Sequence, residues 1–191
     1  MTDKQVWILA GGNGAGKSTF FRQRLEPRGL DFINADVIAA NLAPGDVEAQ
    51  SYAAAFAARS LYRQYINDGR SFCYETVFSH PSKIEFVEVA RKAAYHVVLV
   101  YIHLVDGLHA LRVDQRVSEG GHTVDPKKIL SRLPRTLQNV TVAAPLASEL
   151  LVFDNSYFEN PFQLVAHRCG ARIEYAVDPL PDWCKGMLDG H

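Results

Sequence analysis

A glycine-rich stretch near the start of the chain has the composition of a phosphate-binding loop. Residues 11–18 have the sequence GGNGAGKS, which fits the pattern G-x-x-x-x-G-K-S, and the apolar run VWILA precedes them. Glycines let successive backbone N–H groups surround phosphate oxygens, and the helix that follows adds the positive end of its dipole. We expect Lys17 to bridge the β- and γ-phosphates of ATP and Ser18 to bind Mg²⁺. The predicted nucleotide contacts are Gly12, Asn13, Gly14, Ala15, Gly16, Lys17, Ser18 and Thr19.

Two acidic residues could complete the chemistry of phosphoryl transfer. That reaction needs an acceptor hydroxyl in line with the γ-phosphate and a carboxylate that orients the hydroxyl and takes its proton. Asp36 ends the segment FINAD, and Glu75 precedes Thr76 in CYET, each near the end of a predicted strand. Open α/β sheets bind ligands beyond the carboxyl ends of their strands, so these residues are candidates for the site. The alternatives are that Asp36 only caps the next helix and that Glu75 only pairs with an arginine.

Arginines are frequent in the segment 107–147, which has a helical pattern interrupted by EGGHTVDP. Arg112 and Arg116 are four residues apart and would share one helix face, and Arg132 and Arg135 follow the glycine pair. Arginines on a closing lid can stabilise the charge of the transition state. We therefore expect a helical lid over this segment whose arginines, Arg112 among them, contact the substrate or the phosphates. A rigid helical hairpin with a solvated arginine face is the alternative.

The order of the predicted elements is that of an α/β domain, because strand-like runs alternate with helix-like ones. The run 96–104 is almost continuously apolar and β-branched, as is typical of a strand buried on both faces. Strands are predicted at 5–11, 31–36, 71–77, 96–104 and 149–155, helices at 46–68 and 82–95, and a hairpin at about 162–177. We expect one domain over 1–191 with a three-layer P-loop NTPase fold of the kinase-like type. Its central sheet should be mostly parallel.

Local patterns add detail to these elements. Asp125 followed by Pro126 is typical of an N-cap and first helical turn. His122 could contact a phosphate and Asp154 could position the lid or the base, but a loop position and a structural turn, respectively, are the simpler explanations. The residues expected to face inward are Val47, Ala54, Ala57, Leu61 and Tyr65 in the first long helix and Ile84, Val87, Ala90 and Ala94 in the next.

Composition narrows the class of protein. The 191 residues carry 20 basic and 21 acidic side chains. This balance argues against a protein that binds nucleic acid through its overall charge. Three cysteines without C-x-x-C spacing argue against a disulfide framework or a structural zinc site and fit a reducing cytoplasm. No stretch approaches the roughly 18 apolar residues of a membrane span. We expect a cytoplasmic protein with no membrane contact.

The remaining motifs favour a small-molecule kinase. A GTPase should carry an N-K-x-D-like motif that binds the base, and a transport ATPase should carry an L-S-G-G-Q-like signature; the sequence has neither. A polynucleotide kinase or helicase should be more basic. A non-catalytic or slow ATPase that acts as a nucleotide-dependent binding module stays open, and so does a nucleic-acid end kinase.

The ordered set GGNGAGKSTF, FINAD, SFCYETVFS, RVSEGGHTVDPKKILSR and FDNS resembles the zeta-toxin family, especially its short chromosomal branch, over roughly residues 5–156. The resemblance implies a kinase that uses ATP and Mg²⁺ to phosphorylate a sugar hydroxyl of UDP-N-acetylglucosamine. It implies that Asp36 is the base, that Glu75 and Thr76 hold the substrate, and that Arg116 and Arg132 meet the phosphates. It also implies a possible antitoxin partner, whereas related proteins use other acceptors such as dinucleotides.

Overall fold

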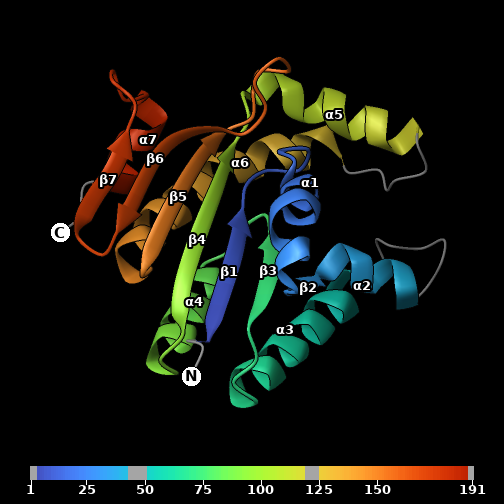
Figure 1. Cartoon of the computed structure of the whole chain (residues 1–191). Helices are drawn as coiled ribbons and strands as arrows, with labels where there is room; N and C mark the ends of the chain where they lie inside the picture. The colour runs from blue at the N-terminus through green and yellow to red at the C-terminus, as the bar shows by residue number, and fades with distance from the viewer. Residues whose placement is uncertain (1–3, 43–50, 119–124, 189–191) are drawn as a thin grey trace.

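A seven-stranded sheet forms the centre of the molecule (Figure 1). The computed structural model describes residues 4–42, 51–118 and 125–188. The strands lie in the order β2 (Asp31–Asn34), β3 (Phe72–Thr76), β1 (Gln5–Ala10), β4 (His96–His103), β5 (Glu149–Asp154), β6 (Gln163–Cys169) and β7 (Arg172–Ala176). The strands from β2 to β5 are parallel to their neighbours, and β6 and β7 extend the sheet in antiparallel fashion. The predicted α/β class with a mostly parallel sheet is confirmed.

Helices cover the two faces of the sheet unequally. One core packs the buried sides of α3 (Ser51–Asn67), α4 (Ser82–Lys92), α6 (Pro126–Ala143) and α7 (Asp182–Leu188) against one face. On the other face, α1 (Lys17–Phe20) and the π-helical turns that continue it to Leu25 pack on β1, β3, β4 and the end of β5. The connecting helices are α2 (Ala35–Leu42), which follows β2, and α5 (Asp106–Ser118), which follows β4. Of the helices described, none is both long enough and apolar enough to cross a membrane.

Strands β1 and β4, in the middle of the sheet, are apolar apart from their terminal residues because both of their faces are covered. Val6, Ile8 and Ala10 of β1 point into the core beneath α4 and α6, whereas Leu9 points toward α1. Residues 97–102 of β4 are all buried. These strands need no polar face, which explains why their sequences lack the alternation of a half-exposed strand.

Several element boundaries differ from the sequence-based expectations. The strand predicted to run to Asp36 ends at Asn34, because the chain turns there into α2, a helix that was not predicted. Helix α7 was also missed. In α3 the fully buried residues are Ala54, Ala58, Tyr62 and Ile66, so the buried stripe runs one residue later than predicted, and Ala57, Leu61 and Tyr65 are only half-buried. In the next helix, Val87 and Ala90 are buried and Ile84 is half-buried, but α4 ends at Lys92 and leaves Ala94 exposed.

Only part of the segment 107–147 lies where a movable lid could form. Asp125 caps α6 by accepting a hydrogen bond from the Lys127 N–H at 2.9 Å, as the Asp-Pro pair indicated. At the other end of α6, Val140 and Ala143 are completely buried in the core under the sheet, as is Ala144 directly after the helix. This buried end of α6 therefore cannot belong to a moving lid. The glycine bend and Val47 lie outside the described residues.

Candidate active site

The P-loop joins β1 to α1 at the carboxyl edge of the sheet. Gly14 and Gly16 have positive φ values of 78° and 96°, a conformation that suits glycine. Gly12 is required for a different reason, because a Cβ there would lie 2.4 Å from Cε1 of His109. His109 is buried under the loop, with its Nδ1 2.6 Å from the carbonyl oxygen of Asn13. The loop is thus shaped by its own glycines and supported from below by α5.

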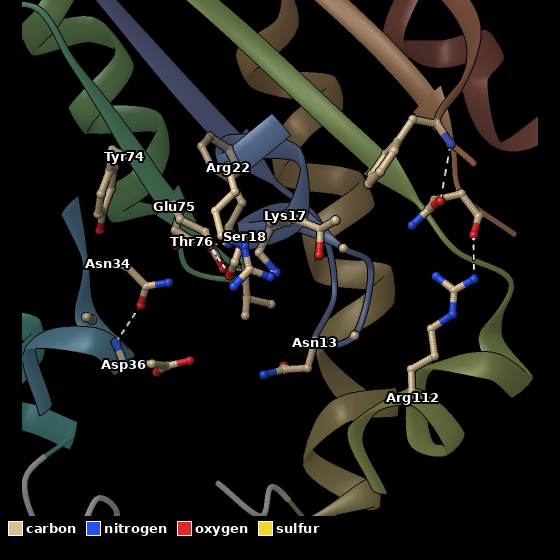
Figure 2. A pocket seen from close by; sticks show the side chains of 18 of the residues that line it. Asn13, Lys17, Ser18, Arg22, Asn34, Asp36, Tyr74, Glu75, Thr76 and Arg112 are labelled. Carbon is tan, nitrogen blue, oxygen red and sulfur yellow. Dashed lines mark hydrogen bonds and ion pairs between the residues drawn. The ribbon is translucent and has the colours of Figure 1, made fainter. Parts of the chain in front are cut away.

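Lys17, Ser18 and Glu75 form a compact polar group beside the loop (Figure 2). The Ser18 hydroxyl donates a hydrogen bond to Oε2 of Glu75 at 2.7 Å, and Nζ of Lys17 lies 3.9 Å from Oε1 of the same carboxylate. Lys17 also donates to the Gly12 carbonyl at 2.9 Å and is only 6% exposed. Register brings Glu75 here, because β3 pairs with β1 so that Glu75 is opposite Leu9, just before the loop. A hydroxyl and a carboxylate in contact are hard oxygen ligands of the kind that Mg²⁺ prefers.

The loop after β5 holds the other side of the P-loop. Asn155 is 5% exposed, and its side-chain amide donates to the Ala15 carbonyl at 2.9 Å and accepts from the Phe162 N–H at 3.2 Å. Its own carbonyl accepts a 2.9 Å hydrogen bond from the guanidinium of Arg112 on α5 (Figure 2). Burial lowers the pKa of Arg112. Asn155 therefore connects the P-loop, β5 and α5.

A cavity of about 740 Å³ extends from the P-loop to α2 and α4. Asp36 lines it from the first turn of α2, where the Asn34 side chain accepts a hydrogen bond from the Asp36 N–H at 2.7 Å. Its far wall contains Lys83 and Tyr74, whose Nζ and hydroxyl are 2.6 Å apart. Burial lowers the pKa of Lys83 and raises the pKa of Tyr74 to about 12. The cavity thus has a phosphate-binding end and a second polar end with room for another molecule.

Residues 6–138 match a protein family described as an AAA domain. The chain belongs to this family. No match is found among curated protein sequences.

Solved structures share the fold of this AAA domain at low sequence identity. The AvrRxo1-ORF1:-ORF2 complex with ATP matches with a TM-score of 0.72 and 17% identity over 90% of this chain and 60% of that one. A chain of the PezAT chromosomal toxin-antitoxin system of Streptococcus pneumoniae matches with a TM-score of 0.65 and 15% identity over 81% and 68%. A candidate kinase from Chloroflexus aurantiacus has a TM-score of 0.65 and 16% identity over 83% and 92%. The chain spans about 60% of the AvrRxo1 chain with ATP. The predicted resemblance to the zeta-toxin family is confirmed at the level of the fold.

The AAA domain brings most of the predicted site residues to one cavity. Its lining includes Asn13, Gly14, Gly16, Lys17, Ser18, Thr19, Asp36, Glu75, Thr76 and Arg112. Gly12 instead lines a separate cavity of about 300 Å³ behind the loop, and Ala15 is buried in the core.

The remaining predicted residues lie elsewhere. Arg132 is half-buried on α6 and is not among the described residues that line the main cavity, and Arg135 is exposed and donates to the Ser131 carbonyl. Asp154 accepts from the Ser156 N–H at 2.9 Å, which is a structural turn. Arg116 lies on α5, but its side chain is outside the described part of the chain, as is the whole of His122.

Several contributors to the site were missed by sequence reasoning. Arg22 lies one turn after Ser18 and lines the cavity above Lys17 and Glu75 (Figure 2). Its spacing from the P-loop was a usable signal. Lys83 gave no such signal, because a lysine in an amphipathic helix is usually solvated. Asn155 was visible only as part of FDNS, the motif that follows a buried strand.

Proposed function

We propose that the protein is an ATP-dependent kinase that transfers the γ-phosphate to a hydroxyl of a nucleotide sugar such as UDP-N-acetylglucosamine. The observation that carries the proposal is the arrangement of the cavity. One end holds the contacting group Lys17, Ser18 and Glu75, and the other end holds Asp36 and Lys83. Nucleotide binding alone would need only the P-loop end of the cavity, so the second polar end favours a second substrate.

The nucleotide end fits ATP with Mg²⁺. The glycine conformations leave the loop backbone close to the cavity. The Lys17 ammonium would contact the β- and γ-phosphates when ATP binds. The Ser18 hydroxyl and the Glu75 carboxylate would hold the metal, directly or through water. The bound metal neutralises charge on the phosphates. Arg22 and Arg112 add positive charge at the same cavity.

The acceptor end fits a molecule with both a hydroxyl and a negative charge. Asp36 is exposed at the start of α2 and is a base for the hydroxyl. Asn13 has a buried Oδ1 with no hydrogen-bond partner among the described residues, and it can accept from a sugar hydroxyl. Lys83 is half-buried with its cation toward the Tyr74 hydroxyl, where a phosphate of the acceptor would offset its burial. A nucleotide sugar carries all the matching groups.

Arginines from α5 and α6 would complete the site on closure. Arg112 already lines the cavity, whereas Arg132 would have to approach it by movement of the first turns of α6. The buried end of α6 would be the fixed base of that movement. Arg116 of α5 is the second arginine that we propose to meet the phosphates. An antitoxin-like protein partner is part of this proposal, because AvrRxo1-ORF1 and PezAT are described with a partner or as a toxin-antitoxin system.

The test is an acceptor screen with Asp36→Asn. The protein is incubated with ATP, Mg²⁺ and a panel of nucleotide sugars, dinucleotides and oligonucleotide ends, and the products are identified by mass spectrometry. We expect a phosphorylated nucleotide sugar from the wild type and a rate lower by about 10²–10⁴-fold from Asp36→Asn, with unchanged ATP affinity. Asp68→Asn, in an exposed turn after α3, is the matched control.

Other outcomes identify the alternatives. ADP release without any phosphorylated acceptor would support the slow ATPase that acts as a binding module. A phosphorylated oligonucleotide end would support the alternative that the protein is a nucleic-acid end kinase. Wild-type transfer by Asp36→Asn would show that Asp36 is not the base, although the protein would remain a kinase.

A further inference from the structure

A group of potential metal ligands lies at the edge of the sheet opposite the P-loop. Glu149 begins β5, and His167 and Cys169 lie near the end of β6. In the antiparallel ladder, Cys169 is opposite Glu149 and His167 is opposite Leu151. Because directly opposed residues and residues two apart share a face, all three side chains project from the same side of the sheet.

The ligand atoms of these residues are close enough to share one cation. They all lie within 4.8 Å of one another. Nε2 of His167 is 2.7 Å from Oε1 of Glu149 and 3.3 Å from Sγ of Cys169. Tetrahedral zinc with bonds of about 2.0–2.3 Å separates its ligand atoms by roughly 3.3–3.7 Å. Small side-chain rotations would therefore admit the ion, and the two strands that carry the ligands are held by the ladder.

The surroundings leave the group accessible and give the carboxylate a second partner. Helix α1 reaches β5 through Phe153, near the end of that strand, whereas no described helix lies over the start of β5 and the end of β6 on this face (Figure 1). Glu149 and His167 are 23% and 27% exposed. Nε2 of His96, at the start of β4, lies 3.4 Å from Oε2 of Glu149. This histidine can hold the carboxylate while its other oxygen binds a metal.

The mixture of donors selects the kind of metal. One thiolate, one imidazole and one carboxylate suit zinc and its neighbours among the transition metals, whereas Mg²⁺ and Ca²⁺ prefer oxygen alone. Metal binding would form the metal–sulfur bond and release the thiol proton to solvent. The site therefore would not compete for the Mg²⁺ of the nucleotide cavity.

We propose that Glu149, His167 and Cys169 form a zinc-class metal site that links β5 to the antiparallel extension of the sheet, with water completing the coordination. The site is independent of the proposed kinase activity. The three cysteines include no C-x-x-C pair, which is the sequence pattern typical of structural zinc sites. The ligands instead come from two strands, and Glu149 and His167 are 18 residues apart in the chain.

The experiment uses chelator-treated full-length protein and Co²⁺ or Zn²⁺ in the presence of excess Mg²⁺. We expect one Co²⁺ per chain, with a near-ultraviolet thiolate-to-cobalt charge-transfer band, and displacement of the Co²⁺ by Zn²⁺. Cys169→Ser should abolish the band and weaken Zn²⁺ binding in calorimetry by more than about 100-fold, since even outer partners of ligands contribute 10–100-fold. His80→Asn, which removes a histidine outside the group, should bind as the wild type does.

Thiol reactivity gives a second measurement on the unmodified chain. Cys73 and Cys184 are buried, so Ellman's reagent should label Cys169 first in the folded protein, and Zn²⁺ should protect it. Absence of the charge-transfer band, or equal Zn²⁺ affinity in wild type and Cys169→Ser, would overturn the proposal. Unchanged labelling of Cys169 at saturating Zn²⁺ would also overturn it. None of these readouts depends on kinase activity.

Discussion

Glu75 shows how much chemistry one residue can acquire from its neighbours. Its carboxylate accepts from the Ser18 hydroxyl and lies near the Lys17 ammonium, although these residues are 57 and 58 positions away in sequence. Pairing with a lid arginine was the alternative at the sequence level. The contact with Ser18 instead favours a role on the nucleotide side of the cavity, at the proposed Mg²⁺ site.

Glu75→Gln tests that role because it keeps the shape and removes the charge. We expect phosphoryl transfer to fall by about 10²-fold or more, since one preorganised electrostatic contact is worth that much, and the Mg²⁺ concentration for half-maximal rate to rise. Single-turnover assays over a Mg²⁺ titration measure both. Glu85→Gln, on the exposed side of α4, is the control. An unchanged Mg²⁺ dependence in Glu75→Gln would contradict the assignment.

At the scale of elements, the P-loop depends on α5 as well as on its own glycines. The absent side chain of Gly12 lets His109 and Leu133 approach, and a Cβ would lie 2.4 Å and 2.5 Å from their nearest atoms. One neighbour belongs to α5 and the other to α6, so both helices are in contact with the back of the loop. Movement of these helices would therefore shift the P-loop and change how it contacts the phosphates of a bound nucleotide.

Gly12→Ala should displace the loop. We expect overpacking to lower the free energy of unfolding by about 1–3 kcal/mol and to weaken ATP binding, as measured by urea denaturation and by calorimetry. Gly107→Ala is the matched control, because a Cβ at this position in the first turn of α5 would meet no atom within 4 Å. If Gly12→Ala bound ATP as tightly as Gly107→Ala, the close packing behind the loop would not matter for binding.

Helix α6 also fixes the loop that follows β3. Phe78 has a φ of 65°, which is unfavourable for a residue with a side chain, and its carbonyl accepts from the buried amide of Asn139 at 3.0 Å. Thr136 donates to the Val77 carbonyl at 2.9 Å. The loop lines the cavity directly after Glu75 and Thr76, so α6 helps to position the acceptor end.

Asn139→Leu should leave the Phe78 carbonyl unsatisfied. We expect a loss of about 1–3 kcal/mol in the free energy of unfolding, measured by urea denaturation. Gln138→Leu, at the exposed neighbouring position on the same helix, should change it little. Equal effects of the two substitutions would show that the hydrogen bond does not stabilise the strained loop.

At the scale of the whole molecule, the half-buried His103 and the buried His109 connect stability to pH. Burial lowers the pKa of His103, whose ring stacks on Trp183 of α7 at 3.9 Å, and burial also lowers the pKa of His109. The unfolded chain, with histidine pKa values of about 6.5, therefore binds protons first as the pH falls. Stability is complete above that value and decreases as the pH drops toward the lowered values of the folded state.

His103→Phe keeps a ring against Trp183 and removes one of these titrations. We expect the wild type to lose stability between about pH 7.5 and pH 5.5 and the variant to lose less over the same interval, measured by urea denaturation at each pH. His80→Asn removes an exposed histidine and should retain the wild-type pH dependence. A steeper dependence in His103→Phe would contradict the direction of the shift.

The sequence by itself determined the phosphate-binding loop, the α/β class and the apolar strands at the centre, because these depend on local spacing and hydrophobic periodicity. It did not determine α2, α7 or the shifted buried face of α3, where tertiary packing overrides weak local preferences. Predictability was therefore high for Lys17 and Ser18, which lie within one motif. It was low for Lys83 and Asn155, whose partners come from other elements.

Only the tertiary structure brought distant groups into contact. Parallel pairing of β3 with β1 set Glu75 against Ser18, and the antiparallel addition of β6 placed Cys169 opposite Glu149. The same packing buried the end of α6, which the arginine pattern had suggested as part of a lid. The physical reason is that motif spacing records neighbours along the chain, whereas strand register and helix packing decide which side chains meet in space.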